Sequence, residues 1–237
     1  MSLATFEPIQ WTSSGPLGDL LDVSYFLRSQ GIDPEKIDAE KYYRRISIFE
    51  EARKEAETLI HPRALFILIS VKQIQDGEII LQGNEVIQSR LLASLLKSAG
   101  EILVGVSTLG DALEKRVDEH FKQGDSAKAV ALDGWGTAAL ASFARQFEKH
   151  FGTIARARGK NLSIIFEPGH AEWPLDQQQV LFRLLPAQKI GMRLTSSSLM
   201  IPKKSVSRLV GLGNGLFAEG TKCNYCSRQK QCLFRQS

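Results

Sequence analysis

The chain has 237 residues, 43% of them hydrophobic, and a chain of this length can bury one large core or two small ones. Its 30 Lys and Arg residues exceed its 26 Asp and Glu residues by a net charge of +4 that is spread along the sequence, so no dense basic stripe predicts nucleic-acid binding. No stretch approaches the roughly twenty apolar residues that span a bilayer, and the N-terminal segment lacks a signal-peptide pattern. We therefore expect a cytoplasmic protein with no membrane or nucleic-acid partner.

The N-terminal quarter has helical patterns. Leu17 to Arg28 and Glu35 to Leu59 predict two helices, and the second ends near the helix-breaking pair His61-Pro62. We expect an N-terminal helical region at 1–62 that packs on an α+β core at 63–217, followed by a cysteine-containing tail at 218–237.

The core begins with a predicted β-hairpin. Ala64 to Val71 is a strongly β-forming run, and a turn at Asp76-Gly77 leads to a second strand, Glu78 to Leu81. Leucines at helical spacing then predict a helix from Glu85 to Ser98, with Gly100 as its cap.

A third strand and another helix are predicted next. Ile102 to Val106 reads as strand, and Asp111 to Lys122 as helix. Residues 131–140, A-L-D-G-W-G-T-A-A-L, contain small residues that would allow close packing in a helix. Asp133 in this segment is the best acidic candidate of the N-terminal half for hydrogen bonding to a ligand's amine or ribose.

A Pro-Gly turn follows the next predicted strand. Leu162 to Phe166 is a short apolar run, and Pro168-Gly169 ends it in a tight turn that presents backbone rather than side chains. The pattern suits either an ordinary strand-end turn or a site where a planar or charged ligand approaches the backbone closely.

Hydroxyl side chains gather farther along. A helix is predicted to start at Pro174, a strand at Ile190 to Leu194, and the cluster 195–198 follows where that strand ends. Four adjacent hydroxyls can satisfy loop backbone or bind the polar rim of a ligand.

All three cysteines, Cys223, Cys226 and Cys232, fall within the last fifteen residues. Their C-x2-C-x5-C spacing predicts three thiolates within reach of one iron-sulfur cluster or zinc ion, although a closed site needs a fourth ligand. An odd number of cysteines argues against a simple disulfide framework. Three reduced thiols without a metal are the alternative.

Two segments resemble the activation domain of cobalamin-dependent methionine synthase. The family pattern L-T-x-S-x-x-M-x-P-x-x-S-V-S is matched by Leu194, Thr195, Ser197, Met200, Pro202, Ser205, Val206 and Ser207. Pro168, Gly169 and Pro174 match the family turn R-x-x-P-G-Y-x-x-x-P. The segments 104–110 and 131–140 also look like parts of stand-alone relatives of this domain, which often carry a similar cysteine-rich tail.

The resemblance has three departures. Ile165 stands where the family turn has arginine, His170 where it has tyrosine, and Ser196 where the second pattern has glutamate. Because an isoleucine cannot grip a carboxylate as an arginine does, the departures put binding of the methionine end of S-adenosylmethionine in question.

The resemblance implies an α+β fold with a twisted, mainly antiparallel sheet flanked by helices. It also implies activation or maintenance of a corrinoid-dependent methyltransferase such as methionine synthase, by reductive methylation of the cobalt with S-adenosylmethionine. The partner would then be a corrinoid-binding protein or methyltransferase that carries the cobalamin. The residues expected to face the cofactor are Glu167, Pro168, Gly169, His170 and Glu172, with Thr195, Ser197 and Ser205 lining the opposite loop.

Two other classes remain open. The chain could be a non-catalytic adaptor that binds a corrinoid protein, or a redox protein that uses its C-terminal cysteines. A serine-histidine-acid arrangement, a phosphate loop and a G-x-G-x-x-G motif are all absent from the sequence, so hydrolase, kinase and dehydrogenase functions have no support. Whether the chain is itself an enzyme or an accessory to one is not decided by its sequence.

Overall fold

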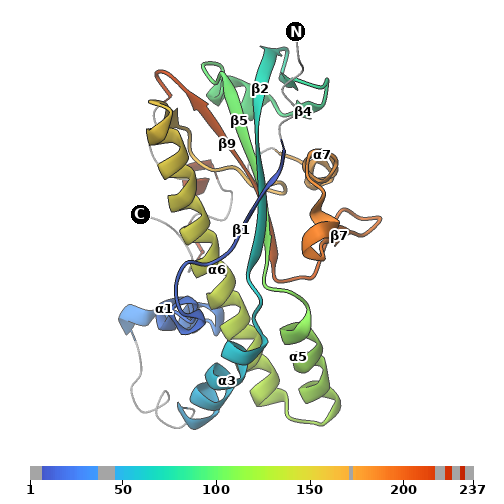
Figure 1. The fold of residues 1–237 in the computed structure, drawn as a ribbon. Coiled ribbons are helices and arrows are strands. Elements are labelled where there is room, and N and C mark those ends of the chain that lie inside the picture. Colours follow the sequence, from blue (N-terminus) through green and yellow to red (C-terminus); the bar gives the residue numbers. More distant parts are fainter. Residues whose placement is uncertain (1–6, 37–45, 171–172, 217–221, 226–229, 233–237) are drawn as a thin grey trace.

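One antiparallel sheet with helices on both faces makes up the body of the protein (Figure 1). The computed structural model describes residues 7–36, 46–170, 173–216, 222–225 and 230–232. The strand order is β4-β3-β2-β5-β9-β6, with β1 added beside β2, and every pair is antiparallel. The predicted α+β class with a mainly antiparallel sheet is confirmed.

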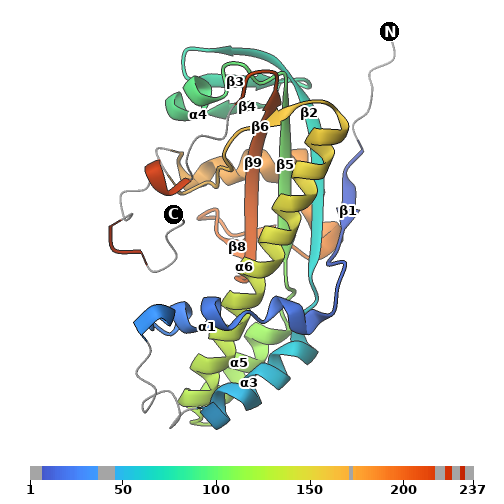
Figure 2. The same cartoon turned by 90° about the vertical axis from the view of Figure 1, so that its left-hand side faces the viewer.

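The strands of this sheet differ greatly in length. They are β1 (Ile9–Trp11), β2 (Arg63–Gln75), β3 (Glu78–Leu81), β4 (Val86–Gln88), β5 (Glu101–Thr108), β6 (Asn161–Leu162) and β9 (Ser205–Gly213). A separate small ladder pairs β7 (Arg193–Leu194) with β8 (Met200–Ile201). The long strands β2, β5 and β9 lie side by side and form the centre of the fold (Figure 2).

The longest helix of the described part of the chain, α6, runs across one face of the sheet in front of β5 and β9 and continues beyond it beside α1, α3 and α5 (Figure 2). The α-helices are α1 (Val23–Ser29), α3 (Ile46–Leu59), α4 (Arg90–Leu95), α5 (Ala112–Lys122), α6 (Ser126–Ala157) and α7 (Gln178–Leu184). Short 3-10 helices lie at Leu17–Leu20, Pro34–Lys36, Leu175–Gln177, Ala187–Ile190 and Lys222–Tyr225. None of the helices that the structure describes is both long and apolar enough to cross a membrane.

Two apolar clusters lie on opposite faces of the sheet. On the α6 face, four aromatic side chains of α6 pack against the sheet and against α1 and α3: Trp135, Phe143, Phe147 and Phe151. On the other face, α4 and α7 cover a second cluster that includes Trp173. Because side chains alternate along a strand, β5 contributes Leu103 to the first cluster and Ile102 and Val104 to the second.

The small residues of α6 allow the close packing that the sequence predicts. A Cβ built on Gly134 would lie 2.7 Å from Ser29 Oγ on α1, and one on Gly136 would lie 2.7 Å from Leu113 Cδ2 on α5. Both glycines therefore admit a neighbouring helix, and the predicted close helix contact is confirmed.

The predicted hairpin of β2 and β3, the strand β5 and the helix α5 are confirmed. The helix predicted for Glu85 to Ser98 is wrong in its first part. Val86–Gln88 forms β4, and α4 begins only after Ser89, whose side chain accepts a hydrogen bond from Leu92 N at 3.2 Å. Gly100 does not cap this helix, because Leu96 is its C-cap residue.

Other boundaries also differ from the predictions. The helix predicted from Leu17 is broken by Asp22, which caps α1, and the part of the second predicted helix at 37–45 lies outside the described residues. The strand predicted for 162–166 is reduced to β6 and a single bridge from Phe166 to Leu209. The strand predicted from Ile190 starts only at Arg193, after a left-handed Gly191 with φ of 78°. The division of the chain at residues 62 and 217 stays a prediction.

Candidate functional site

The Pro168-Gly169 turn folds back on itself beside strand β9. Gly169 has φ of 86°, a left-handed conformation that a residue with a side chain adopts only with strain. Its N–H donates to Trp173 O at 2.8 Å, and the N–H of His170 donates to Glu167 O at 3.1 Å. Gly169 and His170 are exposed, while Pro168 is buried. The turn therefore presents a fixed backbone at the surface, as the sequence predicts.

The turn stands where the sheet stops pairing on the outer side of β9. Leu209 exchanges both backbone hydrogen bonds with Phe166, at 2.8 and 2.9 Å. Continuing this register places Pro168 opposite Ser207, and a proline has no N–H to donate. The ladder therefore ends at Pro168.

Backbone groups of β9 beyond this point are directed away from β5 and lie in a buried position, since Ser207 is 1% and Ser205 7% exposed. Because the residues of an antiparallel strand alternate in direction, Ser207 and Ser205 direct their N–H and C=O groups to the same side as Leu209. In the part of the chain that the structure describes, no strand pairs with these groups. A short free edge of β9 thus lies next to the Pro168-Gly169 turn.

A buried ion cluster joins the turn to β9 and α6. Arg208 has only 7% of its side chain exposed, and its Nε and Nη2 both lie 3.0 Å from Glu167 Oε1. Its Nη1 donates to Ala144 O at 2.8 Å and to Glu148 Oε1 at 2.6 Å, both on α6. Sequence reasoning missed Arg208; the available signal was a lone charge inside the apolar strand S-V-S-R-L-V-G-L-G.

The hydroxyl residues beneath the turn form a buried polar network. Ser207 Oγ donates to Gln178 Oε1 at 2.8 Å, and the amide nitrogen of Gln178 donates to Ser198 O. Ser205 Oγ donates to Thr108 Oγ1 at 2.9 Å on β5. The network fixes α7 and the loop 195–198 on the sheet, so these hydroxyls have a structural role.

Thr195 and Ser197 lie in the turn between β7 and β8. Thr195 Oγ1 accepts from Leu199 N at 3.0 Å, while Ser197 is exposed. Gln178 and Gln179 at the start of α7 donate to Ser198 of this turn, and Gln178 also accepts from Ser207 of the sheet. The structure therefore brings Thr195, Ser197 and Ser205 to the same side of the sheet as α7, the first two on one turn and Ser205 on strand β9.

An unpaired donor lies inside the turn. Trp173 is 2% exposed, and its indole Nε1 has no hydrogen-bond partner among the residues that the structure describes. Leaving a buried N–H unpaired is costly, so such a donor next to an exposed turn is a position where a ligand acceptor would be stabilised.

Comparison with known proteins gives the fold a precedent. No family model and no curated protein matches the chain. Among solved structures, a crystal structure of the MetH reactivation domain bound to AdoHcy superposes with a TM-score of 0.69 at 16% sequence identity, covering 92% of this chain and 82% of that chain. The chain has the fold of the MetH reactivation domain. The structural resemblance inferred from the sequence motifs is thereby confirmed.

Asp133 does not join the turn within this MetH reactivation domain fold. Its Oδ1 lies 2.8 Å from Lys204 Nζ, which also donates to Thr137 Oγ1 at 2.9 Å. Asp133 and Glu148 are separated along α6 by about 22 Å at 1.5 Å per residue. A ligand role for Asp133 stays a prediction that would need a ligand reaching far along α6.

The remaining predicted residues are only partly described. Glu172 and Cys226 lie outside the described residues. Cys223 is buried in the 3-10 helix Lys222–Tyr225, and Cys232 is exposed. No group of three or more His, Cys, Asp or Glu side chains suited to a metal ion occurs among the described residues, so the metal prediction stays untested.

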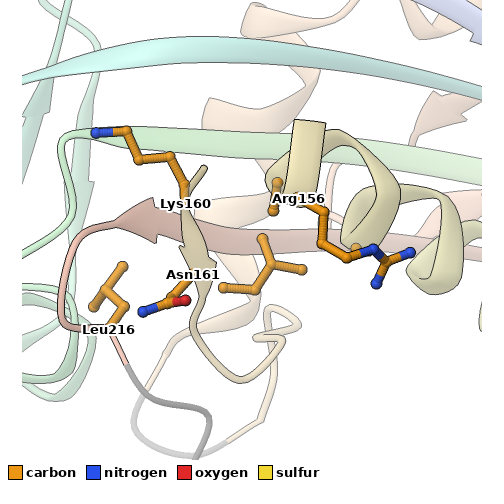
Figure 3. A pocket seen from close by; sticks show the side chains of 7 residues that line it. Arg156, Lys160, Asn161 and Leu216 are labelled. Atoms are coloured by element: carbon orange, nitrogen blue, oxygen red, sulfur yellow. The ribbon is translucent and has the colours of Figure 1, made fainter. Parts of the chain in front are cut away.

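A pocket of about 350 Å³ lies elsewhere, at the C-terminal end of α6 (Figure 3). Arg156, Lys160 and Asn161 form its polar rim, and Leu162 and Leu216 belong to its apolar wall. Figure 3 shows the Arg156 and Lys160 side chains pointing in different directions, so their charges do not converge on one ligand atom. None of its lining residues belongs to the Pro168-Gly169 turn, and we place the candidate site at the turn.

Proposed function

We infer that this chain activates or maintains a cobalamin-dependent methyltransferase such as methionine synthase, by presenting S-adenosylmethionine to a corrinoid held on a separate protein. The observation that carries the proposal is the left-handed Pro168-Gly169 turn beside the free edge of β9, in a fold shared with a reactivation domain whose crystal structure contains AdoHcy. A free strand edge, an exposed turn and the unpaired Trp173 donor suit a ligand with several hydrogen-bonding groups.

S-adenosylmethionine would supply the methyl group that traps the reduced cobalt. The chain's part is to hold and orient this ligand. The exposed backbone at Gly169 allows close approach. The Trp173 indole and the backbone groups of Ser205 and Ser207 are suited to polar atoms of the part of the ligand that enters the buried side of the turn. Glu167 provides a carboxylate at the same turn, with 12% of its side chain exposed.

Recognition of the ligand's carboxylate is the weak point of this fit. Ile165 is partly buried and packs against the apolar cluster on the α6 face, so no cation stands at this position. Arg208 supplies a guanidinium on the neighbouring strand β9, but its contacts are with Glu167, Ala144 and Glu148. We therefore expect weaker binding of the carboxylate than a family arginine would give.

The proposal is tested by a reactivation assay. A cobalamin-dependent methyltransferase that lacks its own activation domain is oxidised at cobalt and mixed with a one-electron reductant, S-adenosylmethionine and this protein. We expect the absorption spectrum of the methylated corrinoid to appear only when all components are present. If the methylated corrinoid forms equally well without this protein whenever the reductant and S-adenosylmethionine are present, the proposal is overturned.

A paired variant shows whether the turn is responsible. Gly169→Ala places a Cβ in the left-handed region, 3.3 Å from Leu175 Cδ1. Gly31→Ala is the matched control, because Gly31 has φ of 73°, nothing lies within 4 Å of its Cβ position, and it is far from the turn in sequence. Each change costs about 1 kcal/mol of backbone strain, and we expect only Gly169→Ala to lose reactivation.

The adaptor function is the second candidate, and the apolar environment of Ile165 favours it. In that case the wild-type protein binds the corrinoid protein without binding S-adenosylmethionine. Calorimetric titration of wild type and of the double variant Ile165→Arg, His170→Tyr separates the two functions. Ligand binding by wild type supports activation, whereas binding by the double variant alone supports the adaptor.

A further inference from the structure

Arg208 is an unusual residue for its place in the sheet. It lies in β9 between Ser207 and Leu209, and it is buried with 6% of the residue exposed. Burying a guanidinium is costly unless its N–H groups are hydrogen-bonded and its charge is paired. Arg208 meets both conditions, because Glu167 and Glu148 are its carboxylate partners.

The guanidinium connects three separate parts of the fold. One side, Nε and Nη2, bonds to Glu167 at the start of the Pro168-Gly169 turn. The other side, Nη1, bonds to the Ala144 carbonyl and the Glu148 carboxylate of α6. A planar, rigid group with five N–H donors can hold such a geometry, whereas a single ammonium on a flexible stem cannot.

Fixing Glu167 fixes the rest of the turn. The carbonyl of Glu167 accepts from His170 N at 3.1 Å, and the carbonyl of His170 accepts from Trp173 N at 3.1 Å. The His170 ring nitrogen Nδ1 lies 3.9 Å from Glu167 Oε2. A shift of Glu167 would therefore move both the exposed backbone at Gly169 and the buried Trp173.

We propose that Arg208 is the positioning residue of the ligand-facing turn: by clamping Glu167 to β9 and α6, it sets the conformation in which residues 167–170 receive a ligand of the S-adenosyl class. This inference rests on the proposed function for the identity of the ligand. Arg208 itself acts through Glu167 and the turn. The cation of this chain thus lies on β9, next to the turn. The activation-domain pattern that the chain resembles has its arginine within the turn, at the position of Ile165.

Four variants separate this role from a general contribution to stability. Arg208→Met removes the charge, and Arg208→Lys keeps the charge without the fork. Glu167→Gln weakens the bond on the turn side, and Glu148→Gln is its matched control, because it weakens a bond to the same guanidinium on the helix side. Thermal unfolding of each variant reports the shared loss of stability.

The decisive readout is amide hydrogen exchange at Gly169 and His170, whose N–H groups are bonded within the turn. We expect Arg208→Met, Arg208→Lys and Glu167→Gln to speed this exchange by about tenfold or more, since each breaks or weakens the charged hydrogen bonds to the turn. Glu148→Gln and the amides of α3 should change by less than about threefold. In calorimetry with AdoHcy as the probe, these three variants should bind more weakly than the wild type, whereas Glu148→Gln should bind nearly as well as the wild type.

Each outcome decides a different claim. Unchanged exchange at Gly169 and His170 in Arg208→Met, or full rescue by Arg208→Lys, would overturn the positioning role. If wild-type protein binds neither AdoHcy nor S-adenosylmethionine, the proposed function fails, while the exchange measurement still decides whether Arg208 sets the turn. Wild-type binding that survives in Arg208→Met with a loosened turn would refute the link between turn and ligand.

Discussion

Gly105 sets how closely α6 can approach the sheet. A Cβ at this position in β5 would lie 2.8 Å from both Phe147 Cε1 and Phe151 Cζ, inside the apolar cluster on the α6 face. We expect Gly105→Ala to lower the free energy of unfolding by about 1–3 kcal/mol, because two packed rings would have to move. Gly100→Ala, where nothing lies within 4 Å, should stay within about 0.5 kcal/mol of wild type. Equal losses in the two variants, measured by urea unfolding, would contradict this account.

Individual residues of the site were predictable to different degrees. Pro168 and Gly169 could be recognised because proline and glycine restrict the backbone wherever they stand. The hydroxyls could not be assigned, because a serine in the sequence gives no sign of whether a partner such as Thr108 lies across the sheet from Ser205. Arg208 depends on Glu167 and Glu148, which lie 41 and 60 residues away in the sequence.

At the scale of elements, an ionic cluster joins α3 to α5. Glu55 on α3 accepts a hydrogen bond from Arg116 Nε, and His120 Nε2 lies 3.1 Å from its Oε2. Burial raises the pKa of Glu55, but the hydrogen bonds from Arg116 and His120 outweigh burial and leave the pKa below the ordinary 4.5. The ionised carboxylate is therefore the form that stabilises the fold.

This cluster predicts a pH dependence of stability. Because the folded-state pKa of Glu55 is depressed, its contribution is complete above the unfolded-state pKa and is lost as the pH falls through the folded-state pKa. We expect Glu55→Gln to lower the free energy of unfolding by about 2 kcal/mol at pH 7. Below a pH of about 4, the difference in unfolding free energy between this variant and the wild type should become smaller. Glu119→Gln is the control, since Glu119 bonds to the same Arg116 but is half exposed. A gap that does not depend on pH would show that Glu55 acts through packing alone.

Elements were predictable where local signals agreed with tertiary packing. The β2–β3 hairpin has both a turn signal and β-branched runs, and the structure forms it. Between residues 85 and 98 the leucine spacing predicts a helix that includes Val86 and Ile87, but these two residues pair with β3. The sequence does not predict β9, because its serines and Arg208 break the apolar pattern. Pairing with β5 and side-chain partners distant in the sequence stabilise these residues as strand.

At the scale of the whole molecule, the sheet is shared by two cores. Strands β5 and β9 direct alternate side chains to the α6 face and to the α7 face, with Val210 on the first and Leu209 on the second. If β5 and β9 unfold, both apolar clusters therefore lose the side chains that these strands contribute. The Pro168-Gly169 turn belongs to this shared structure, since Glu167 contacts the α6 side through Arg208 while Trp173 packs on the α7 side.

We therefore expect both faces to unfold in one transition. A variant that retains Trp135 as its sole tryptophan reports the α6 face, and one that retains Trp173 reports the α7 face. In each variant the fluorescence midpoint in urea should coincide with the far-ultraviolet circular dichroism midpoint of the same variant, as a two-state transition requires. Comparing probes within one variant removes the stability lost through the substitutions. A Trp173 transition that precedes the loss of secondary structure would mean that α7 and the turn open as a separate unit, and the turn would then be a mobile part of the molecule rather than a preformed one.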